Sequence, residues 1–228
     1  MTRRRVLVGT LTVAACFSIQ AFAQRPSHGR LFPPQDLGLL EGPDRDAWQR
    51  PDQVMDALGI ADGAHVADLG AGAGWFTVRL ARRVGPNGLV YAEDIQPQMI
   101  EAINRRVARE GLRNVRTVRG TSTNPHLPEG RLDAVLLVSI YYEIEDPVAL
   151  LKNVGRSLKP RGRVGIIDFR PGGGGPGPDP EERIEPHIVI RDAEAAGLEL
   201  IGEEEFLPYQ FLLIFGRAAT PARSREGP

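Results

Sequence analysis

The fold is decided by a short stretch, Val66-Ala67-Asp68-Leu69-Gly70-Ala71-Gly72-Ala73-Gly74. Residues 65–69 predict a β-strand and residues 75–84 predict an amphipathic helix, so the three glycines lie in the loop between them. Glycine lets the backbone approach a ligand closely, and the start of a helix offers N–H groups without helical partners. The stretch therefore predicts a strand, a loop and a helix arranged around a ligand.

An acidic residue, Asp94, lies just after the next predicted strand, residues 88–92. A carboxylate in this place can accept hydrogen bonds from both hydroxyls of a ribose, as it does in dinucleotide-binding folds. The nicotinamide-dinucleotide fingerprint, however, needs a small residue where this chain has Trp75. A nicotinamide-dependent oxidoreductase is therefore disfavoured, and another nucleoside ligand is favoured.

Strands and helices alternate along the rest of the chain. The apolar run 132–138 is typical of a central strand that is buried on both faces. The alternation predicts an α/β fold with a doubly wound, mostly parallel sheet of seven strands and an antiparallel edge hairpin. The remaining strands are predicted at 115–118, 163–169, 198–202 and 211–215, and the remaining helices at 98–110, 147–158 and 190–197.

Over about residues 50–216, the chain resembles the class I S-adenosylmethionine-dependent methyltransferases, in particular the small-molecule branch called type 11. Residues 66–74 resemble the first motif of that family, whose glycine loop cradles the methionine part of the cofactor. Asp94 matches the acid that holds the ribose, and Ile95 is placed to pack on the adenine. The resemblance implies a Rossmann-like methyltransferase fold and S-adenosylmethionine as the cofactor.

Two further motifs support the resemblance, and one departs from it. Residues 158–163, Leu-Lys-Pro-Arg-Gly-Arg, resemble the family's Leu-Lys-Pro-Gly-Gly turn, and residues 131–135 resemble its fourth-strand motif. The family usually has an acid after the third strand, where this chain has Thr121 and Ser122, and a hydroxyl there can make one hydrogen bond to the adenine. The resemblance implies these cofactor-binding residues: Asp68, Gly70, Ala71, Gly72, Gly74, Asp94, Ile95, Thr121, Ser122 and Ser139.

Candidate catalytic residues follow the fourth strand, where the family presents residues that face the substrate. Glu143 is a candidate general base, and Tyr141 and Tyr142 are candidates to line the pocket. The alternative is two half-buried tyrosines and a solvated glutamate. Asp168, which ends the fifth strand, is either structural or pocket-lining. Methyl transfer needs mainly alignment of the acceptor, because the cofactor carries the activated group.

Composition and charge exclude several other classes of protein. The chain has 228 residues, of which 42% are hydrophobic, and a formal net charge of −1, which disfavours nucleic-acid binding through bulk charge. Its single cysteine, Cys16, excludes a disulfide framework and a cysteine-based zinc site. The four histidines are scattered, so no metal site is predicted. Arsenite is not expected as an acceptor, because residues after the leader contain no thiol.

The N-terminal segment predicts an exported protein. Arg3, Arg4 and Arg5 precede an apolar stretch, which ends in Ala21-Phe22-Ala23, and this order is typical of a secretory signal cleaved after Ala23. Two alternatives stay open, a lipoprotein anchored at Cys16 and a twin-arginine signal. The predicted organisation is a signal peptide (1–23), a Pro/Gly-rich arm (24–44), a methyltransferase-like domain (45–217) and a disordered tail (218–228).

These features predict an exported enzyme, periplasmic or secreted, that transfers a methyl group by in-line displacement to a small-molecule acceptor. The alternative is a non-catalytic exported protein that keeps the fold and binds a ligand in its crevice. No nucleic-acid partner and no stable membrane span after signal removal are expected. Neither the acceptor nor the oligomeric state is predicted.

Overall fold

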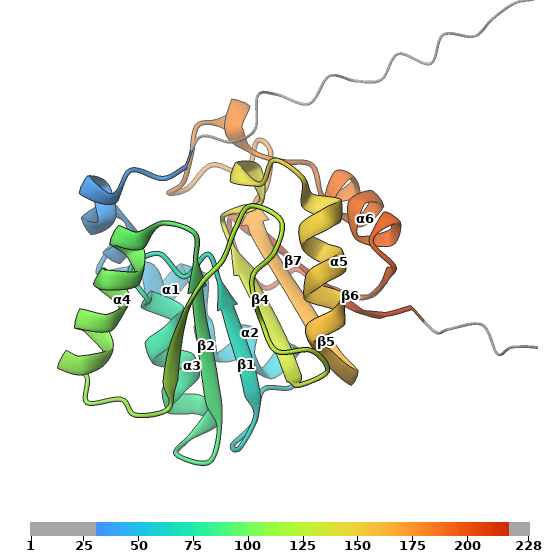
Figure 1. Ribbon diagram of the computed structural model, residues 1–228. Coiled ribbons are helices and arrows are strands. Elements are labelled where there is room, and N and C mark those ends of the chain that lie inside the picture. Colours follow the sequence, from blue (N-terminus) through green and yellow to red (C-terminus); the bar gives the residue numbers. More distant parts are fainter. Residues whose placement is uncertain (1–30, 219–228) are drawn as a thin grey trace, which may run out of the picture.

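The computed structural model describes residues 31–218 (Figure 1), so the predicted signal peptide, Cys16 and all but the first residue of the predicted tail lie outside the described residues. The strands form one seven-stranded sheet in the order β3-β2-β1-β4-β5-β7-β6. Their bounds are β1 His65–Leu69, β2 Leu89–Asp94, β3 Val115–Arg119, β4 Leu132–Val138, β5 Leu158–Phe169, β6 Leu198–Glu204 and β7 Gln210–Arg217. This is the predicted Rossmann-like arrangement.

Helices cover both faces of the sheet. On one face, α2 (Pro51–Ala57) and α3 (Trp75–Val84) pack in one apolar cluster; on the other, α5 (Pro147–Ser157) and α6 (Pro186–Ala195) pack in a second. The helix α4 (Pro97–Arg109) contacts β2 and β3. The remaining helical segments are α1 Arg45–Gln49 and the 3-10 turns η1 Pro34–Glu41, η2 Tyr141–Glu143 and η3 Pro180–Glu182.

The central strand β4 is buried on both faces of the sheet. Leu137 packs in the cluster beneath α5 and α6, whereas its neighbour Leu136 packs in the cluster beneath α2 and α3, and both are fully buried. Successive side chains of a strand point to opposite faces, so a continuous apolar run suits a strand covered on both sides. The prediction of a buried central strand is confirmed.

The C-terminal hairpin is also confirmed. The strand β7 lies between β5 and β6 and is antiparallel to both, while β1 to β5 pair in parallel. The strand β5 begins earlier than predicted, at Leu158, because the turn motif forms an irregular start that pairs Leu158 with Leu132 and resumes with Arg163 opposite Ala134. The predicted turn is therefore a bulge in the strand.

The described part of the Pro/Gly-rich arm contains one helical segment. This segment, η1, begins at Pro34, which stands at the first helical position. Proline suits that position, because its missing N–H would have no helical partner and its fixed φ matches a helix. Within residues 31–218, none of the helices combines the length and hydrophobicity needed to cross a membrane.

Candidate functional site

The glycine loop between β1 and α3 turns sharply at three positions. Gly70, Gly72 and Gly74 have φ angles of 67°, 54° and 77°, in the left-handed region that side chains disfavour. A Cβ atom at Gly70 would lie 2.7 Å from the Cδ1 atom of Ile140, which follows β4. The loop therefore needs glycine both for its backbone angles and for its packing.

The structure brings Asp94 against this loop. One carboxylate oxygen of Asp94 accepts a hydrogen bond from the Gly72 N–H at 3.0 Å, and the other accepts one from the Gln96 N–H at 2.9 Å. The side chain is buried, and burial raises the pKa of Asp94 above its ordinary value. A carboxylate has about four acceptor positions, so its remaining lone pairs can accept from ribose hydroxyls. Ile95 lies half-buried beside it.

Asp68 lies beneath the loop rather than at its surface. Its carboxylate accepts a hydrogen bond from the Thr77 hydroxyl at 2.6 Å, which ties the end of β1 to the first turn of α3. Burial raises the pKa of Asp68 to about 6, and the Thr77 hydrogen bond acts in the opposite direction. Asp68 therefore holds the loop in its conformation, and Ala71 does the same through its N–H, which donates to the Glu93 carbonyl at 2.8 Å.

Glu93 is a site residue that sequence reasoning missed. Its carboxyl group accepts a hydrogen bond from the Gly70 N–H at 3.3 Å, and a Cβ atom at position 120 would overlap its other oxygen, so Gly120 is needed there. Burial, reinforced by the charge of Asp94, raises the pKa of Glu93 to about 8. The available signal was an acid inside an apolar strand, directly before Asp94.

Thr121 and Ser122 are exposed in the turn after β3. The Thr121 hydroxyl is hydrogen-bonded to Asn124, donating to its carbonyl at 3.2 Å and accepting from its N–H at 3.0 Å. The structure therefore uses Thr121 to close its own turn, and Gly120 is the residue of this segment that joins the site, through its N–H to the Asp94 carbonyl at 3.2 Å.

Ser139 directly follows β4 and has a left-handed backbone conformation, with φ 55°. Its hydroxyl accepts a hydrogen bond from the Gln210 side-chain amide at 2.9 Å, and its N–H donates to the Ile167 carbonyl at 2.8 Å. A non-glycine residue in this region costs conformational energy and persists only where its surroundings hold it. Ser139 and Ile140 therefore form a rigid edge opposite the glycine loop.

The three candidate catalytic residues form η2, but they do not share one environment. Tyr141 is buried in the apolar core, where its hydroxyl donates to Asp192 of α6 at 3.0 Å, so its predicted place in the pocket is replaced by a structural one. The N–H of Tyr141 donates to Asp168 at 3.2 Å, and burial raises the pKa of that carboxyl to about 6. Asp168 thus positions η2. Tyr142 is half-buried.

Glu143 meets the N-terminal arm. Its carboxylate accepts a hydrogen bond from the Phe32 N–H at 3.1 Å, and the Phe32 carbonyl accepts one from the Gln96 side chain at 3.1 Å. The main chain of Phe32 therefore bridges the residues that follow β2 and β4, at the carboxyl edge of the sheet where η1 lies in Figure 1. Burial raises the pKa of Glu143 to about 7, although the Phe32 hydrogen bond lowers it.

A bound metal is not indicated by the donor sets on the described part of the chain. Residues 31–218 contain no group of three or more His, Cys, Asp or Glu side chains arranged to hold an ion. The arrangement is suited to binding a ligand along the carboxyl edge of the sheet, next to Asp94 and the glycine loop. Glu143, whose pKa is raised to about 7, could exchange a proton with such a ligand near neutral pH.

Comparisons with known proteins agree with this geometry. Residues 66–162 match the family model described as a methyltransferase domain. The chain is 33% identical over 128 residues to the ubiquinone/menaquinone biosynthesis C-methyltransferase UbiE of Pasteurella multocida, covering 54% of this chain and 45% of that protein. It is 28% identical over 117 residues to the demethylmenaquinone methyltransferase of Geobacillus sp. strain WCH70, covering 51% and 50%.

The chain spans about half the length of the curated relatives that it matches. Among solved structures, a SAM dependent methyltransferase from Aquifex aeolicus superposes with a TM-score of 0.77 at 29% identity. That match covers 81% of this chain and 98% of the Aquifex chain. The similarity therefore extends over nearly the whole described domain, although the matched family model ends with the first residues of β5.

The buried carboxyl of Glu93 predicts a pH-dependent stability. Its pKa rises on folding from 4.5 to about 8, so between these values the folded state holds a proton that the unfolded state has released. The free energy of unfolding should be greatest below pH 4.5 and fall as the pH approaches 8, by up to about 1.4 kcal/mol per pH unit from this group. Glu93→Gln should flatten that slope in urea unfolding measured between pH 6 and 8.

Glu101→Gln, which changes an exposed acid on α4, is the matched control and should keep the slope of the unmodified protein. An unchanged slope in Glu93→Gln would mean that the Glu93 carboxyl is ionised in the folded protein at neutral pH.

Proposed function

We propose that this chain, whose fold and central residues are those of the class I S-adenosylmethionine-dependent methyltransferases, transfers a methyl group from S-adenosylmethionine to a small-molecule acceptor. The observation that carries the proposal is the contact between Asp94 and the glycine loop, where the carboxylate lies 3.0 Å from the Gly72 nitrogen. A nucleoside whose ribose meets Asp94 would place its 5′ substituent along the loop.

The residues around the loop fit this cofactor better than a dinucleotide. Asp68, Glu93 and Asp94 lie close enough for their charges to influence one another, and each of them has a raised pKa. A cationic ligand would favour the ionised forms of these acids, whereas an anionic ligand would disfavour them further. S-adenosylmethionine carries a sulfonium cation, whereas a dinucleotide carries an anionic pyrophosphate.

When bound, S-adenosylmethionine supplies a methyl group that is already activated for displacement. The protein has to align the acceptor and exclude water. Ser139 and Ile140 form the rigid edge beside the loop, and the arm bridges Gln96 and Glu143 above it. The Glu143 carboxylate can take the proton of an acceptor oxygen, nitrogen or activated carbon, because its pKa of about 7 suits proton transfer at neutral pH.

The acceptor is proposed only as a class. By their names, one relative is a C-methyltransferase of ubiquinone/menaquinone biosynthesis and another is a demethylmenaquinone methyltransferase, so quinone-like compounds belong first in an acceptor screen. Phenols, carboxylic acids and amines complete that screen, since a single carboxyl group at the proposed base position can serve each of them.

Export from the cytoplasm is a second part of the proposal, supported by the order of residues 1–23 alone. Fractionation of a bacterial host that expresses the full chain, followed by mass measurement, tests it. A periplasmic or secreted product that begins at Gln24 is expected. A lipid-modified product that begins at Cys16 would replace cleavage after Ala23 with lipid anchoring, and a cytoplasmic product that retains Met1 would overturn export.

Cofactor binding is expected to depend on Asp94. Titration calorimetry should give binding of S-adenosylmethionine and S-adenosylhomocysteine, and none of NAD. Asp94→Ala should weaken binding by about 1.5–3 kcal/mol, because hydrogen bonds to a charged group are lost. Asp94→Asn should lose less, since it keeps one acceptor oxygen. Glu199→Ala, on the exposed side of β6, should bind as the unmodified protein does; equal affinity in Asp94→Ala would remove Asp94 from the site.

The rate of methyl transfer is expected to rise with pH through about 7, as the Glu143 carboxyl loses its proton. Glu143→Gln keeps an acceptor for the Phe32 N–H but cannot take a proton, so kcat should fall and the rising limb should vanish, while the Kd for S-adenosylmethionine stays the same. Glu145→Gln, exposed nearby, is the matched control. A rising limb that persists in Glu143→Gln would assign proton transfer to another group.

A further inference from the structure

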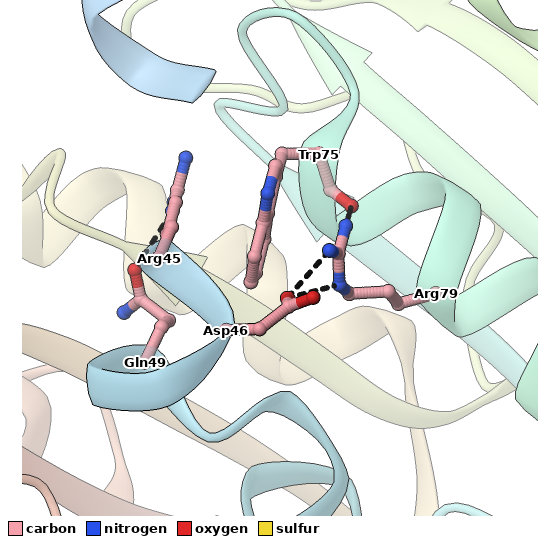
Figure 2. A network of polar contacts seen from close by, with 5 residues as sticks. All are labelled: Arg45, Asp46, Gln49, Trp75 and Arg79. Atoms are coloured by element: carbon pink, nitrogen blue, oxygen red, sulfur yellow. Dashed lines mark hydrogen bonds and ion pairs between the residues drawn. The ribbon is translucent and has the colours of Figure 1, made fainter. Parts of the chain in front are cut away.

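Four polar side chains form a hydrogen-bond network that runs from α1 to the end of β4. The Arg45 Nε donates to the Gln49 side-chain oxygen at 3.0 Å, and the Gln49 amide donates to the Gln210 side-chain oxygen at 2.5 Å. The Gln210 amide then donates to the Ser139 hydroxyl at 2.9 Å. Figure 2 shows the first contact, between Arg45 and Gln49, with the Trp75 ring beside the guanidinium. The network therefore joins α1, β7 and the residue that follows β4.

Arg45 sets the direction of every hydrogen bond in this network. A guanidinium has N–H donors and no acceptor, so Gln49 must turn its amide oxygen toward Arg45. The NH2 group of Gln49 then faces Gln210, which presents its own oxygen and turns its NH2 group to Ser139. Both glutamines are fully buried, so water does not offer them other partners. Burial lowers the pKa of Arg45 only to about 10, so the group stays cationic at neutral pH and keeps this direction.

Ser139 is therefore a hydrogen-bond acceptor toward Gln210, and its own proton is left for another partner. A serine hydroxyl has one proton to donate, and no residue in the described range 31–218 accepts it. Ser139 is half-buried, so a ligand can reach the hydroxyl. Hydrogen bonds in series polarise one another, and a cationic donor at the start of the series strengthens this effect. The Ser139 hydroxyl is thus a preoriented donor.

The Ser139 hydroxyl lies on the side of the site away from Asp94. In the sheet, β1 and β2 lie on one side of β4, whereas β5 and β7 lie on the other. The Ser139 N–H donates to the Ile167 carbonyl on β5 at 2.8 Å, and its hydroxyl contacts Gln210 on β7. Asp94 ends β2, so a nucleoside held there would lie on the first side of β4. The donor faces the side that is left for the methyl acceptor.

We propose that Ser139 donates a hydrogen bond to an oxygen atom of the methyl acceptor, and so selects oxygen-bearing acceptors over amines. This inference rests on the proposed function, within which it narrows the acceptor class. An ammonium nitrogen has no lone pair for this hydrogen bond, and the lone pair of an arylamine is delocalised into its ring. Gln49 and Gln210 are positioning residues, because they act on the acceptor only through Ser139.

An aromatic cluster on the same side of the sheet suggests the shape of suitable probes. The Trp48 ring centroid lies 6.0 Å from that of Phe169, which ends β5, and 6.3 Å from that of Tyr209, which directly precedes β7. Flat apolar rings pack favourably with such side chains. We therefore choose 1-naphthol and 1-naphthylamine, which share one ring system and differ in a single oxygen or nitrogen atom.

The first test measures the binding of both probes to the full chain saturated with S-adenosylhomocysteine. Calorimetry should give about 10-fold tighter binding of 1-naphthol than of 1-naphthylamine, because one oriented hydrogen bond is made by the oxygen alone. Ser139→Gly removes the hydroxyl and suits the left-handed backbone, and it should reduce the preference to within about 2-fold. The affinity for S-adenosylhomocysteine should stay the same.

Gln49→Glu tests the direction of the network from a distance. The new carboxylate accepts from both Arg45 and Gln210, so the Gln210 amide must turn its oxygen to Ser139. The Ser139 hydroxyl then donates to Gln210, and the preference for 1-naphthol should be lost as in Ser139→Gly. Combining the two substitutions should cause no further loss, since both remove the same hydrogen bond. Gln53→Glu, exposed on α2, is the matched control and should keep the preference.

Equal binding of the two probes by the unmodified chain would overturn the inference, and so would a preference that survives in Ser139→Gly. Failure of both probes to bind the S-adenosylhomocysteine complex would also overturn it, while binding of S-adenosylhomocysteine itself leaves the proposed function standing. Weaker S-adenosylhomocysteine binding in Ser139→Gly would assign the hydroxyl to the cofactor instead. If Gln49→Glu loses S-adenosylhomocysteine binding, Ser139→Gly decides alone. An unmodified chain that does not bind S-adenosylhomocysteine would overturn the proposed function itself.

Discussion

The hydrogen bond from the Gly72 N–H to the Asp94 carboxylate joins the two halves of the candidate site. It forms because β1 and β2 are parallel neighbours, with Leu69 opposite Glu93, so that the residues after both strands meet at one edge of the sheet. It also requires the left-handed backbone of the glycine loop, which turns its N–H groups toward β2. This hydrogen bond therefore requires both the parallel pairing of β1 with β2 and glycine in the loop.

Burial of carboxyl groups is the second feature of this edge. Glu93, Asp68 and Glu143 have pKa values raised to about 8, 6 and 7, in each case chiefly by desolvation. These carboxyl groups can therefore gain or lose a proton near neutral pH, whereas exposed carboxyl groups with ordinary pKa values stay ionised there. The same groups that hold the loop by hydrogen bonds also set the charge that a ligand meets.

Residues that precede β1, and so precede the matched family model, also contact the candidate site. Phe32 bridges Gln96 and Glu143 through its main chain, and Arg45 stacks on Trp75. Arg106 of α4 adds a further link, since it donates to Glu41 at 2.5 Å and to the Ala73 carbonyl at 3.3 Å. Contacts at both ends of the site thus come from residues that precede the matched family model.

Much of this architecture followed from local pattern. Three elements have the predicted bounds: the strands His65–Leu69 and Leu132–Val138 and the helix Trp75–Val84. Their bounds could be predicted because apolar periodicity and the positions of loop glycines depend only on neighbouring residues. The pairing of the glycine loop with Asp94 followed from motif and strand order. The start of β5 did not, because a bulge depends on how the strand meets β4.

Residue type and spacing along the chain were sufficient to predict the fold class, the glycine loop and the acid that ends β2, Asp94. Which neighbouring side chains contact the loop depends on how the chain folds in three dimensions. The tertiary structure turned Tyr141 into the core toward Asp192, closed Thr121 onto Asn124, and brought Glu93 beneath the loop and Arg45 beside it. The physical reason is that burial and long-range hydrogen bonds arise from contacts between distant segments, which local periodicity does not encode.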